Sequence, residues 1–417
     1  MSQEIIIIAG KNPETELGGH SSFLRSMARA AVILGYEPHI FCIGPEEAFI
    51  RTDYGVIHQA YSSARTFRQI AIPFLGSRLV RLVLEHLRDK KGPHLIHSLN
   101  VWGYVGAVVR ERLAKQGIEA VHFVNAYTTM EHENLAKIRG LRAVHGPVQW
   151  VKVYLEYGWV KWVMAHYERR AFTEADLLLV NYDSVRRLVS EKYSSELKIE
   201  RITYAPETDF VGPGKSISGE RGEAARAIES LRPVEAPLIV SVSRHDPRKG
   251  VDVLIRALGK LKARGIGFRA CLTSGGTLLP VHRQLANELE LGASTILTGW
   301  VEDPVPFLEM ADIFVLPSLQ EGSGSVSMLE AMQAGKCIVA SNLDGIPEDL
   351  ADGENGLLVQ PGNEDALADR LERAILDERL RRDLGRGAAE TFQSRFSAEA
   401  YVAAIGDLYR RRGFIRV

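Results

Sequence analysis

The sequence predicts an α/β protein made of two doubly wound lobes in series. Short apolar runs alternate with helical stretches along most of the 417 residues, which is typical of parallel sheets covered by helices. A stretch rich in Gly, Pro and Ser, residues 209–223, interrupts this alternation near the middle of the chain. Two such lobes predict a ligand cleft between them, at the carboxyl ends of their strands.

The first lobe is expected to cover residues 1–210. It opens with IIIIA, residues 5–9, an uninterrupted apolar run that is typical of a strand buried on both faces. A helix is expected from about Ser21 to Gly35, because FLRSMARAAVILG has helical periodicity and Gly commonly ends a helix. The remaining expected elements are strands at residues 38–44, 94–99, 120–125, 176–181 and 199–205, and helices at 80–88 and 104–116.

The second lobe is expected to cover residues 236–397, after a hinge at 211–235. Residues 363–386 mix acidic and basic side chains, as a solvated helix does, and the helix expected at residues 398–411 carries apolar residues that must pack somewhere. The other expected elements are strands at residues 236–244, 268–276, 295–300, 313–318 and 336–341, and helices at 251–265, 281–292 and 328–335.

The composition is that of an ordinary globular protein. Hydrophobic residues make up 46%, charged residues 25%, and the formal net charge is −1, so nucleic acid is not an expected partner. Cys42, Cys271 and Cys337 lie in or beside apolar runs, without a CxxC or Cys/His pattern that would indicate zinc, and free buried thiols indicate a reducing compartment. Neither a signal peptide nor an apolar run of about 18 residues is recognisable, so a cytoplasmic protein is expected. The sequence does not indicate the oligomeric state.

The stretch PSLQEGSGSVSMLEAMQAGKCIVAS, residues 317–341, holds two glutamates around a glycine- and serine-rich loop. A short helix is expected to begin near residues 325–327, directly after that loop. The free N–H groups and the positive dipole end of such a helix suit a phosphate. Glu330 would then lie about one turn into the helix, where it could accept hydrogen bonds from ribose hydroxyls. The alternative is a capping box of Ser327 and Glu330, which would tie the glutamate to the backbone.

Two further stretches could contribute to an anion site. In SVSRHDPRKGVDVLIRAL, residues 241–258, Arg244 and Lys249 lie at a strand-to-helix crossing and could neutralise a diphosphate; a solvated basic turn is the alternative. In ELGGHSSF, Gly18 and Gly19 precede the first helix and would let backbone approach a ligand, although a Gly-Gly pair alone is weak evidence. His20 beside them is more often a plain helix-start residue.

Taken together, these motifs resemble the family 4 glycosyltransferases, the retaining group 1 enzymes of the GT-B fold. The matching segments are densest from Pro237 to Val359 and extend over nearly the whole chain. They are ELGGHSSFLRSMARAAVILGY, YERRAFTEADLLLVNYDS (Tyr167–Ser184), SVSRHDPRKGVDVLIRAL, LTSGG, ILTGWVEDPVPFLEMADIFVLPSLQEGSGSVSMLEAMQAGKCIVAS and GIPEDLADGENGLLV.

The resemblance implies a two-lobed GT-B fold with a nucleotide-sugar donor, UDP- or GDP-linked, held mainly by the second lobe, and a final helix that packs back on the first. Arg244 and Lys249 match the diphosphate pair, Glu330 the ribose-binding carboxylate, and Glu321 the part facing the transferred sugar. The implied catalytic residues are Glu321, Arg244 and Lys249, and the implied donor-binding residues are Gly18, Gly19, Arg244, Lys249, Gly322, Ser323, Gly324, Ser325, Val326, Ser327 and Glu330.

The chain departs from the family pattern at two places. Eight residues separate Glu321 from Glu330, one more than is usual, which puts the role of Glu321 in question. The family often has a histidine near the acceptor where this chain has Asn125, an amide that cannot accept a proton at neutral pH. His97, His20 and His132 are the other acceptor-side candidates. No DxD triplet occurs in the sequence, so transfer without a metal or other cofactor is expected.

Alternatives to the transferase remain open at this point. A nucleotide-sugar epimerase would use the same fold without an acceptor, and a non-catalytic nucleotide-sugar binder would fit the two departures. The acceptor itself, whether a sugar, a glycolipid or a small molecule, is not indicated. Residues 148–170 carry Trp150, Trp159 and Trp162 with basic neighbours, which suits either a helix pair packed on the first lobe or a peripheral contact with the inner face of a membrane.

Overall fold

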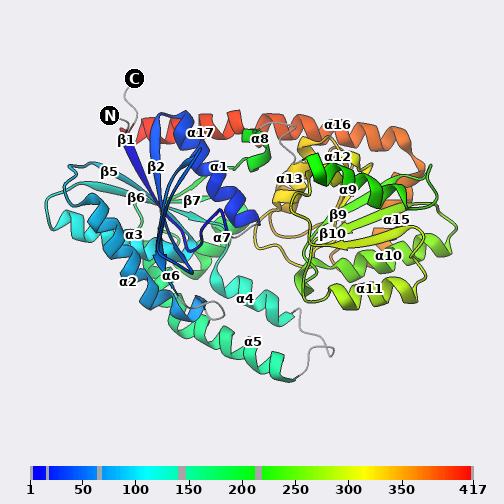
Figure 1. Ribbon diagram of the computed structural model, residues 1–417, viewed down its shortest axis with the longest axis horizontal. Coiled ribbons are helices and arrows are strands. Elements are labelled where there is room, and N and C mark those ends of the chain that lie inside the picture. Colours follow the sequence, from blue (N-terminus) through cyan, green and yellow to red (C-terminus); the bar gives the residue numbers. More distant parts are fainter. Residues whose placement is uncertain (1–2, 16–17, 63–67, 140–146, 212–217, 415–417) are drawn as a thin grey trace. The chain divides into compact units, whose positions relative to one another are not determined.

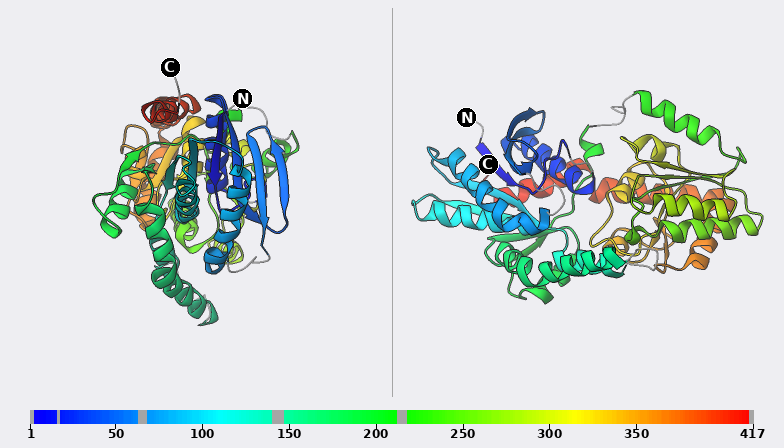
Figure 2. Two further views of the ribbon diagram at one scale, coloured as in Figure 1. Left: turned by 90° about the vertical axis from the view of Figure 1, so that its left-hand side faces the viewer. Right: turned by 60° about the horizontal axis from the view of Figure 1, so that its bottom comes forward.

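A computed structural model of the chain describes residues 3–15, 18–62, 68–139, 147–211 and 218–414. The chain forms two compact units, one of Met1–Phe210 with Ala398–Val417 and the other of Val211–Ser397. Each unit is a mostly parallel sheet with helices on both faces (Figures 1 and 2). The predicted fold class, two doubly wound α/β lobes, is therefore confirmed.

The first unit is built on a sheet with the strand order β3-β4-β2-β1-β5-β6-β7-β8, parallel except for β3, which runs antiparallel to β4. Helices α1 and α17 pack against each other, and α2, α3 and α6 form a second packed group. The strands are β1 (Gln3–Ile8), β2 (Tyr36–Gly44), β3 (Ala48–Thr52), β4 (Gly55–Tyr61), β5 (His94–Leu99), β6 (Ala120–Ala126), β7 (Leu177–Val180) and β8 (Ile199–Arg201).

The helices of the first unit follow the strands in chain order. They are α1 (Gly19–Ile33), α2 (Arg68–Leu87), the 3₁₀ turn η1 (Asn100–Trp102), α3 (Gly103–Ala114), α4 (Met130–Arg139), α5 (Pro147–Trp159), the π-helical turn η2 (Val160–Met164), α6 (Ala165–Thr173), α7 (Asp183–Lys192), α8 (Glu207–Val211) and α17 (Ala398–Arg411). Side chains Ile5 to Ile8 of β1 are at most 1% exposed, because β1 lies between β2 and β5 with helices over the sheet.

The second unit has an all-parallel sheet with the strand order β11-β10-β9-β12-β13-β14. Its strands are β9 (Leu238–Val242), β10 (Arg269–Thr273), β11 (Thr295–Gly299), β12 (Ile313–Leu316), β13 (Cys337–Ser341) and β14 (Leu357–Val359). Its helices are α9 (Ser218–Glu229), the 3₁₀ turn η3 (Pro247–Lys249), α10 (Val251–Ala263), α11 (Leu279–Glu288), α12 (Val305–Met310), α13 (Val326–Gln333), α14 (Ile346–Asp349), α15 (Glu364–Leu376) and α16 (Glu378–Arg395).

Several boundaries differ from the sequence-based expectations. The single helix expected at 363–386 is two helices, because Asp377 leaves the helical conformation and caps α16 by accepting a hydrogen bond from Leu380 N at 2.9 Å. The expected strand at 199–205 pairs only at its first three residues. The β3–β4 hairpin was not anticipated. Of the expected hinge 211–235, residues 218–229 form α9 within the second unit, and residues 212–217 lie outside the described part.

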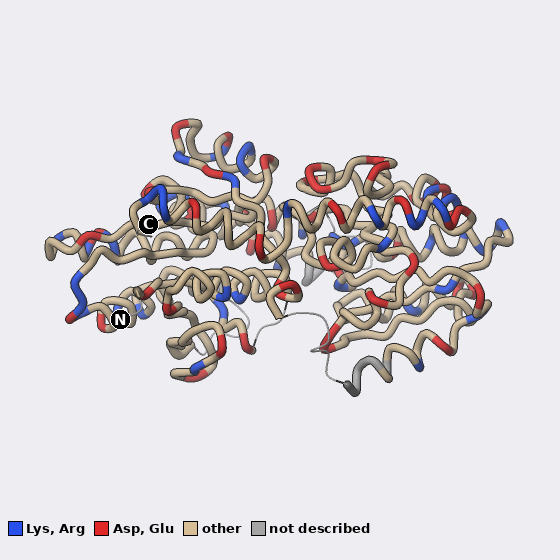
Figure 3. The backbone as a smooth tube through the Cα atoms, turned by 90° about the horizontal axis from the view of Figure 1, so that it is seen from above, with Lys and Arg blue, Asp and Glu red and all other residues tan. Residues whose placement is uncertain are grey.

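Acidic and basic residues are intermixed along the backbone of both units (Figure 3). The three cysteines are buried and free, as the sequence predicts, and burial raises the pKa of each thiol to about 12. Among the described helices, none combines the length and the apolar character needed to cross a membrane.

Candidate functional site

The loop after β9 carries the first cation of the predicted site. The Arg244 side chain is 61% exposed, and its Nη2 lies 3.3 Å from Asp246 Oδ2. Asp246 also caps η3, because its side chain accepts a hydrogen bond from Arg248 N at 3.0 Å. An exposed ion pair of this kind is weak, so an incoming anion can replace the aspartate at the guanidinium.

Lys249, the second cation, ends η3 beside a glycine that the packing requires. Gly250 has φ +58°, and a Cβ at this position would lie 2.1 Å from Pro317 O. The loop after β9 is therefore pressed against the loop after β12, and Leu319 N donates to Arg248 O at 2.7 Å. The side chain at position 249 thus lies beside the loop that follows β12.

Lys249 and Glu321 form a partly buried ion pair. Lys249 Nζ lies 2.7 and 2.6 Å from the two carboxylate oxygens, and the side chains are 17% and 5% exposed. Ser318 Oγ donates a further short hydrogen bond to the same carboxylate. The family resemblance implies that Glu321 faces the transferred sugar; the engagement of its carboxylate by Lys249 and Ser318 is not visible in the sequence.

The glycine- and serine-rich loop is held in place by the segment after β13. Asp344 Oδ2 accepts hydrogen bonds from the backbone N–H groups of Glu321 and Gly322, each at 2.8 Å. Gly345 N donates to Ser323 O at 2.9 Å, and Gly322 has φ +89°. Sequence reasoning missed Asp344; its position in a turn directly after the predicted strand at 336–341 is the signal that could have found it.

Helix α13 begins where the sequence predicts an anion-binding N-terminus. Ser325 is the N-cap, and its hydroxyl accepts a hydrogen bond from Met328 N at 3.4 Å. Ser327 lies within the first turn and donates to Val242 O at 3.2 Å, so the helix starts at the carboxyl end of β9. The alternative capping box of Ser327 and Glu330 is therefore wrong, because the cap lies two residues earlier and Glu330 is the fifth helical residue.

His245 supports the site from within the second unit. It is buried, and burial beside His282 lowers its pKa to about 4. Its ring atom Nδ1 lies 2.8 Å from His282 Nδ1, and its backbone N–H donates to Gly275 O at 2.9 Å. A Cβ at Gly276 would lie 2.4 Å from His245 O, so the LTSGG segment requires glycine here to pack on the loop that carries Arg244.

In the first unit, Gly18 and Gly19 are exposed at the start of α1. Gly18, the N-cap residue, has φ +126°, a conformation that favours glycine. His20 follows them, with its ring 6.2 Å from that of Tyr127 in an edge-on contact. Burial and the nearby Lys11 lower the pKa of His20 to about 4, so the imidazole is neutral at pH 7.

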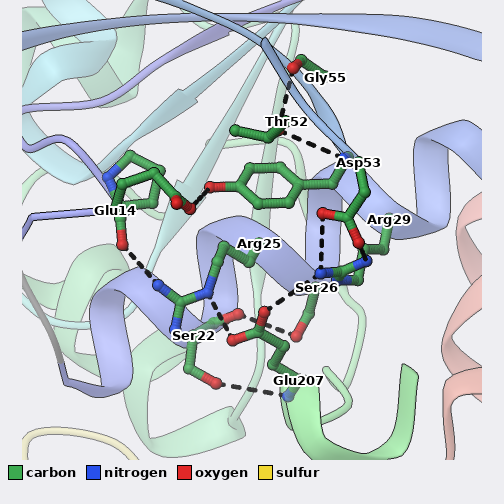
Figure 4. A network of polar contacts seen from close by, with 11 residues as sticks. Glu14, Ser22, Arg25, Ser26, Arg29, Thr52, Asp53, Gly55 and Glu207 are labelled. Carbon is green, nitrogen blue, oxygen red and sulfur yellow. Dashed lines mark hydrogen bonds and ion pairs between the residues drawn. The ribbon is translucent and has the colours of Figure 1, made fainter. Parts of the chain in front are cut away.

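A polar network fixes α1 behind these glycines (Figure 4). Arg25 Nε donates to Glu207 Oε2 at 2.5 Å, and Arg29 pairs with Asp53 at 2.8 Å. Glu207 N in turn donates to Ser22 Oγ at 3.4 Å. Helix α1 is thereby tied both to the β3–β4 turn and to α8, where the chain leaves the first unit.

Two of the predicted acceptor-side residues are buried in the first unit. Asn125 and His97 are 4% and 0% exposed, and Asn125 Nδ2 lies 3.3 Å from His97 Nδ1. His97 Nε2 lies 3.1 Å from the Tyr409 hydroxyl, and Asn125 Nδ2 lies 3.6 Å from Met27 Sδ. This chain of contacts joins β6, β5 and α17, so the geometry favours a structural role for both residues over direct contact with an acceptor.

Comparison with known proteins agrees with the two-unit architecture. Residues 18–205 match the glycosyl transferase 4-like domain, and residues 225–391 match the glycosyl transferases group 1 family. A D-inositol 3-phosphate glycosyltransferase of Saccharomonospora viridis is 31% identical over 330 residues, 76% of this chain and 69% of that protein. The chain is a group 1, family 4 glycosyltransferase.

Other known proteins also resemble this glycosyltransferase. The lipopolysaccharide core biosynthesis glycosyltransferase LpsE of Rhizobium meliloti is 29% identical over 56% of this chain, and the match spans 64% of that protein. Sucrose-phosphate synthase from Thermosynechococcus elongatus superimposes with a TM-score of 0.76 at 20% identity, covering 99% of both chains. Anabaena Alr3699/HepE, crystallised with UDP, has a TM-score of 0.69 at 15% identity, covering 98% of this chain and 100% of its own. The glycosyltransferase therefore has the GT-B fold.

The glycosyltransferase also exposes an apolar stripe along α5 and η2. Val151, Tyr154, Leu155 and Trp162 are 59%, 50%, 70% and 79% exposed, and their spacing places them on one face of the helix. Lys161 Nζ lies 5.7 Å from the centre of the Trp162 ring. Of the two interpretations of residues 148–170, helices packed on the first lobe account for the buried side of this segment, but not for the exposed stripe.

Proposed function

We propose that this chain transfers a hexose from a nucleotide-diphosphate sugar to an acceptor, with retention of anomeric configuration. The observation that carries the proposal is that Lys249 and the N-terminus of α13 gather beside the carboxyl end of β9, with Arg244 exposed on the adjoining loop. Two cations and an open helix N-terminus are what a diphosphate requires, most of all when it departs and gains charge.

In this proposal each group has one task. The exposed Arg244 exchanges its partner Asp246 for a phosphate, and Lys249 turns from Glu321 toward the diphosphate. The first-turn amides of α13, near Ser325, Val326 and Ser327, hold phosphate oxygens, and Glu330 accepts hydrogen bonds from the ribose. These side chains and amides, rather than a metal ion, would neutralise the leaving group.

The UDP complex of HepE supports a nucleotide-sugar donor, and the named activities of the relatives support glycosyl transfer. The experiment that tests the function incubates the protein with UDP- and GDP-hexoses, with and without candidate acceptors, and follows nucleotide release and sugar products. Nucleotide release that depends on an acceptor, with a product that keeps the donor's anomeric configuration, supports the transferase. Epimerised sugar without acceptor would establish the epimerase instead, and binding without turnover under every acceptor tried would establish a non-catalytic binder.

We also propose that the acceptor lies at an anionic lipid surface, to which the α5 stripe binds. Aromatic and aliphatic side chains flanked by Lys152 and Lys161 match the boundary between lipid headgroups and acyl chains. The double variant Leu155→Ser/Trp162→Ser should sediment less with phosphatidylglycerol vesicles than the parent. Leu376→Ser, which changes a similarly exposed leucine in the second unit, is the control. Equal sedimentation of the three proteins would refute the membrane contact.

A further inference from the structure

Three histidines from separate elements of the first unit converge on one point. They are His39 on β2, His58 on β4 and His86 on α2, and one ring nitrogen from each lies within 4.8 Å of those of the other two. His39 Nδ1 lies 2.9 Å from His58 Nε2, and the ring centres of His39 and His86 are 4.3 Å apart. Their separation in the sequence hides the cluster, which explains why no zinc pattern was recognised there.

The groups around the cluster are those that accompany a bound cation. Glu4 on β1 places Oε2 at 3.1 Å from His86 Nε2 and Oε1 at 3.8 Å from His39 Nε2. Lys90 Nζ lies 2.6 Å from both Glu4 oxygens and 2.9 Å from His86 Nε2. The Lys90 ammonium thus lies where the Glu4 carboxylate and the His86 imidazole both contact a positive charge. Because the Lys90 side chain is 35% exposed, it can withdraw to solvent when another cation arrives.

One ring nitrogen of His39, the buried histidine of the cluster, makes no hydrogen bond within the described part of the chain. His39 is 7% exposed, and its Nε2 has no hydrogen-bond partner among the described residues. A buried polar atom without a partner is uncommon in folded proteins and calls for an explanation, of which an ion is one. The ring of His58 is fixed by stacking on Phe41, with ring centres 4.5 Å apart and planes 8° from parallel. The donors are therefore positioned by packing rather than lying on a loose surface.

We propose that His39, His58 and His86 form a binding site for a divalent transition-metal ion such as Zn²⁺. Imidazole nitrogens are the donors that this class of ion prefers, at about 2.0–2.1 Å, and a tetrahedral site of that size holds its nitrogens roughly 3.3 Å apart. Glu4 serves as the fourth ligand or orients His86, and Lys90 competes with the ion for the same position. The ion would link β2, β4 and α2, and would act on the stability of the first unit rather than on sugar transfer.

The test titrates Zn²⁺ into the chelator-stripped full-length protein, in competition with a chromophoric chelator. We expect one ion per chain and a higher midpoint of thermal unfolding with Zn²⁺ than without. His58→Ala and His86→Ala should each weaken binding by at least about 10-fold. Lys90→Met should tighten binding, because it removes the competing ammonium. His166→Ala, which changes an exposed histidine of α6, should bind as the parent does.

A second measurement keeps the test valid if a histidine variant does not fold. Co²⁺ added to the parent protein should give the visible absorption of a four-coordinate ion with nitrogen and oxygen ligands, and Zn²⁺ should abolish it. Binding that is retained by both folded histidine variants, or a stoichiometry that falls equally in His166→Ala, would overturn the proposal. So would weaker binding by Lys90→Met, or the absence of both Zn²⁺ binding and the Co²⁺ spectrum in the parent.

Discussion

Replacing Lys249 by methionine should lower both the stability and the donor affinity of the protein. Lys249 Nζ lies 2.6 and 2.7 Å from the oxygens of Glu321, whose side chain is 5% exposed. Removing one partner of a buried ion pair costs about 3–5 kcal/mol. Because Lys249 is 17% exposed and Ser318 still donates to the carboxylate, we expect a loss of about 2–3 kcal/mol in the free energy of unfolding. If the ammonium also contacts a phosphate, UDP affinity should fall by about 1.5–3 kcal/mol, roughly 10- to 150-fold.

Urea unfolding and calorimetric titration with UDP measure the two effects separately. Lys249→Met/Glu321→Gln removes both charges, so it should recover most of the lost stability while UDP affinity stays low. Lys260→Met on α10, which breaks surface pairs of 3.3 and 2.7 Å to Glu364 and Asp365, is the control and should leave the unfolding midpoint almost unchanged. A folded Lys249→Met protein that binds UDP as tightly as the parent would refute the assignment of Lys249 to the donor site.

Three further predictions follow from the same unit structures. Glu330→Ala should reduce UDP affinity more than stability, because no capping box forms. Ser325→Ala removes the N-cap of α13 and should cost about 1 kcal/mol of stability. Calorimetry with UDP and urea unfolding would distinguish the two variants, and a stability loss of Glu330→Ala that exceeds its loss of UDP affinity would contradict the ribose role. Gly250→Ala should destabilise by more than about 1 kcal/mol, since the added Cβ meets Pro317 O at 2.1 Å; an unchanged unfolding midpoint would contradict this. Burial lowers the pKa of His122 to about 3, below its value of about 6.5 in the unfolded state, so the unfolded state binds more protons and stability falls as the pH drops below about 6.5. His122→Gln should therefore make the dependence of the unfolding free energy on acid pH shallower, by up to about 1.4 kcal/mol per pH unit. An unchanged slope in unfolding measurements would refute this prediction.

The sequence predicted the sheets well because buried parallel strands are short, continuous apolar runs. The strand at 94–99 was predicted with both bounds correct, and the final helix at 398–411 likewise. The β3–β4 hairpin was missed because its strands, AFIRT and GVIHQAY, are short, carry polar residues and follow no helix. The break between α15 and α16 was missed because the charged pattern continues through Asp377, and only the conformation of that residue and its cap separate the helices.

Local motifs were more informative about the second unit than about the first. The start of α13 near Ser325 could be predicted, because a glycine-rich loop followed by a cap residue is a local signal. The engagement of Glu321 by Lys249 could not, since it depends on two loops 72 residues apart being pressed together at Gly250. The burial of Asn125 was also invisible in the sequence, because its partners come from other strands and from the distant helix α17.

The pairing of Lys249 with Glu321 has a consequence for donor binding. Burying an ammonium without a counter-charge is costly, so the carboxylate offsets that cost and fixes the ammonium in one position before a ligand arrives. Arg244 is similarly matched by Asp246. Both cations therefore already have a carboxylate partner. A diphosphate would gain only the difference in free energy between its own contacts with the cations and the carboxylate contacts that it replaces. In the proposed site that difference would grow as the leaving diphosphate accumulates charge, so this arrangement would stabilise the transition state more than the bound donor. In this view Glu321 contributes to catalysis by positioning Lys249, and the extra residue before Glu330 does not remove that role, because the contact depends on the loop around Gly250 and not on the spacing of the two glutamates.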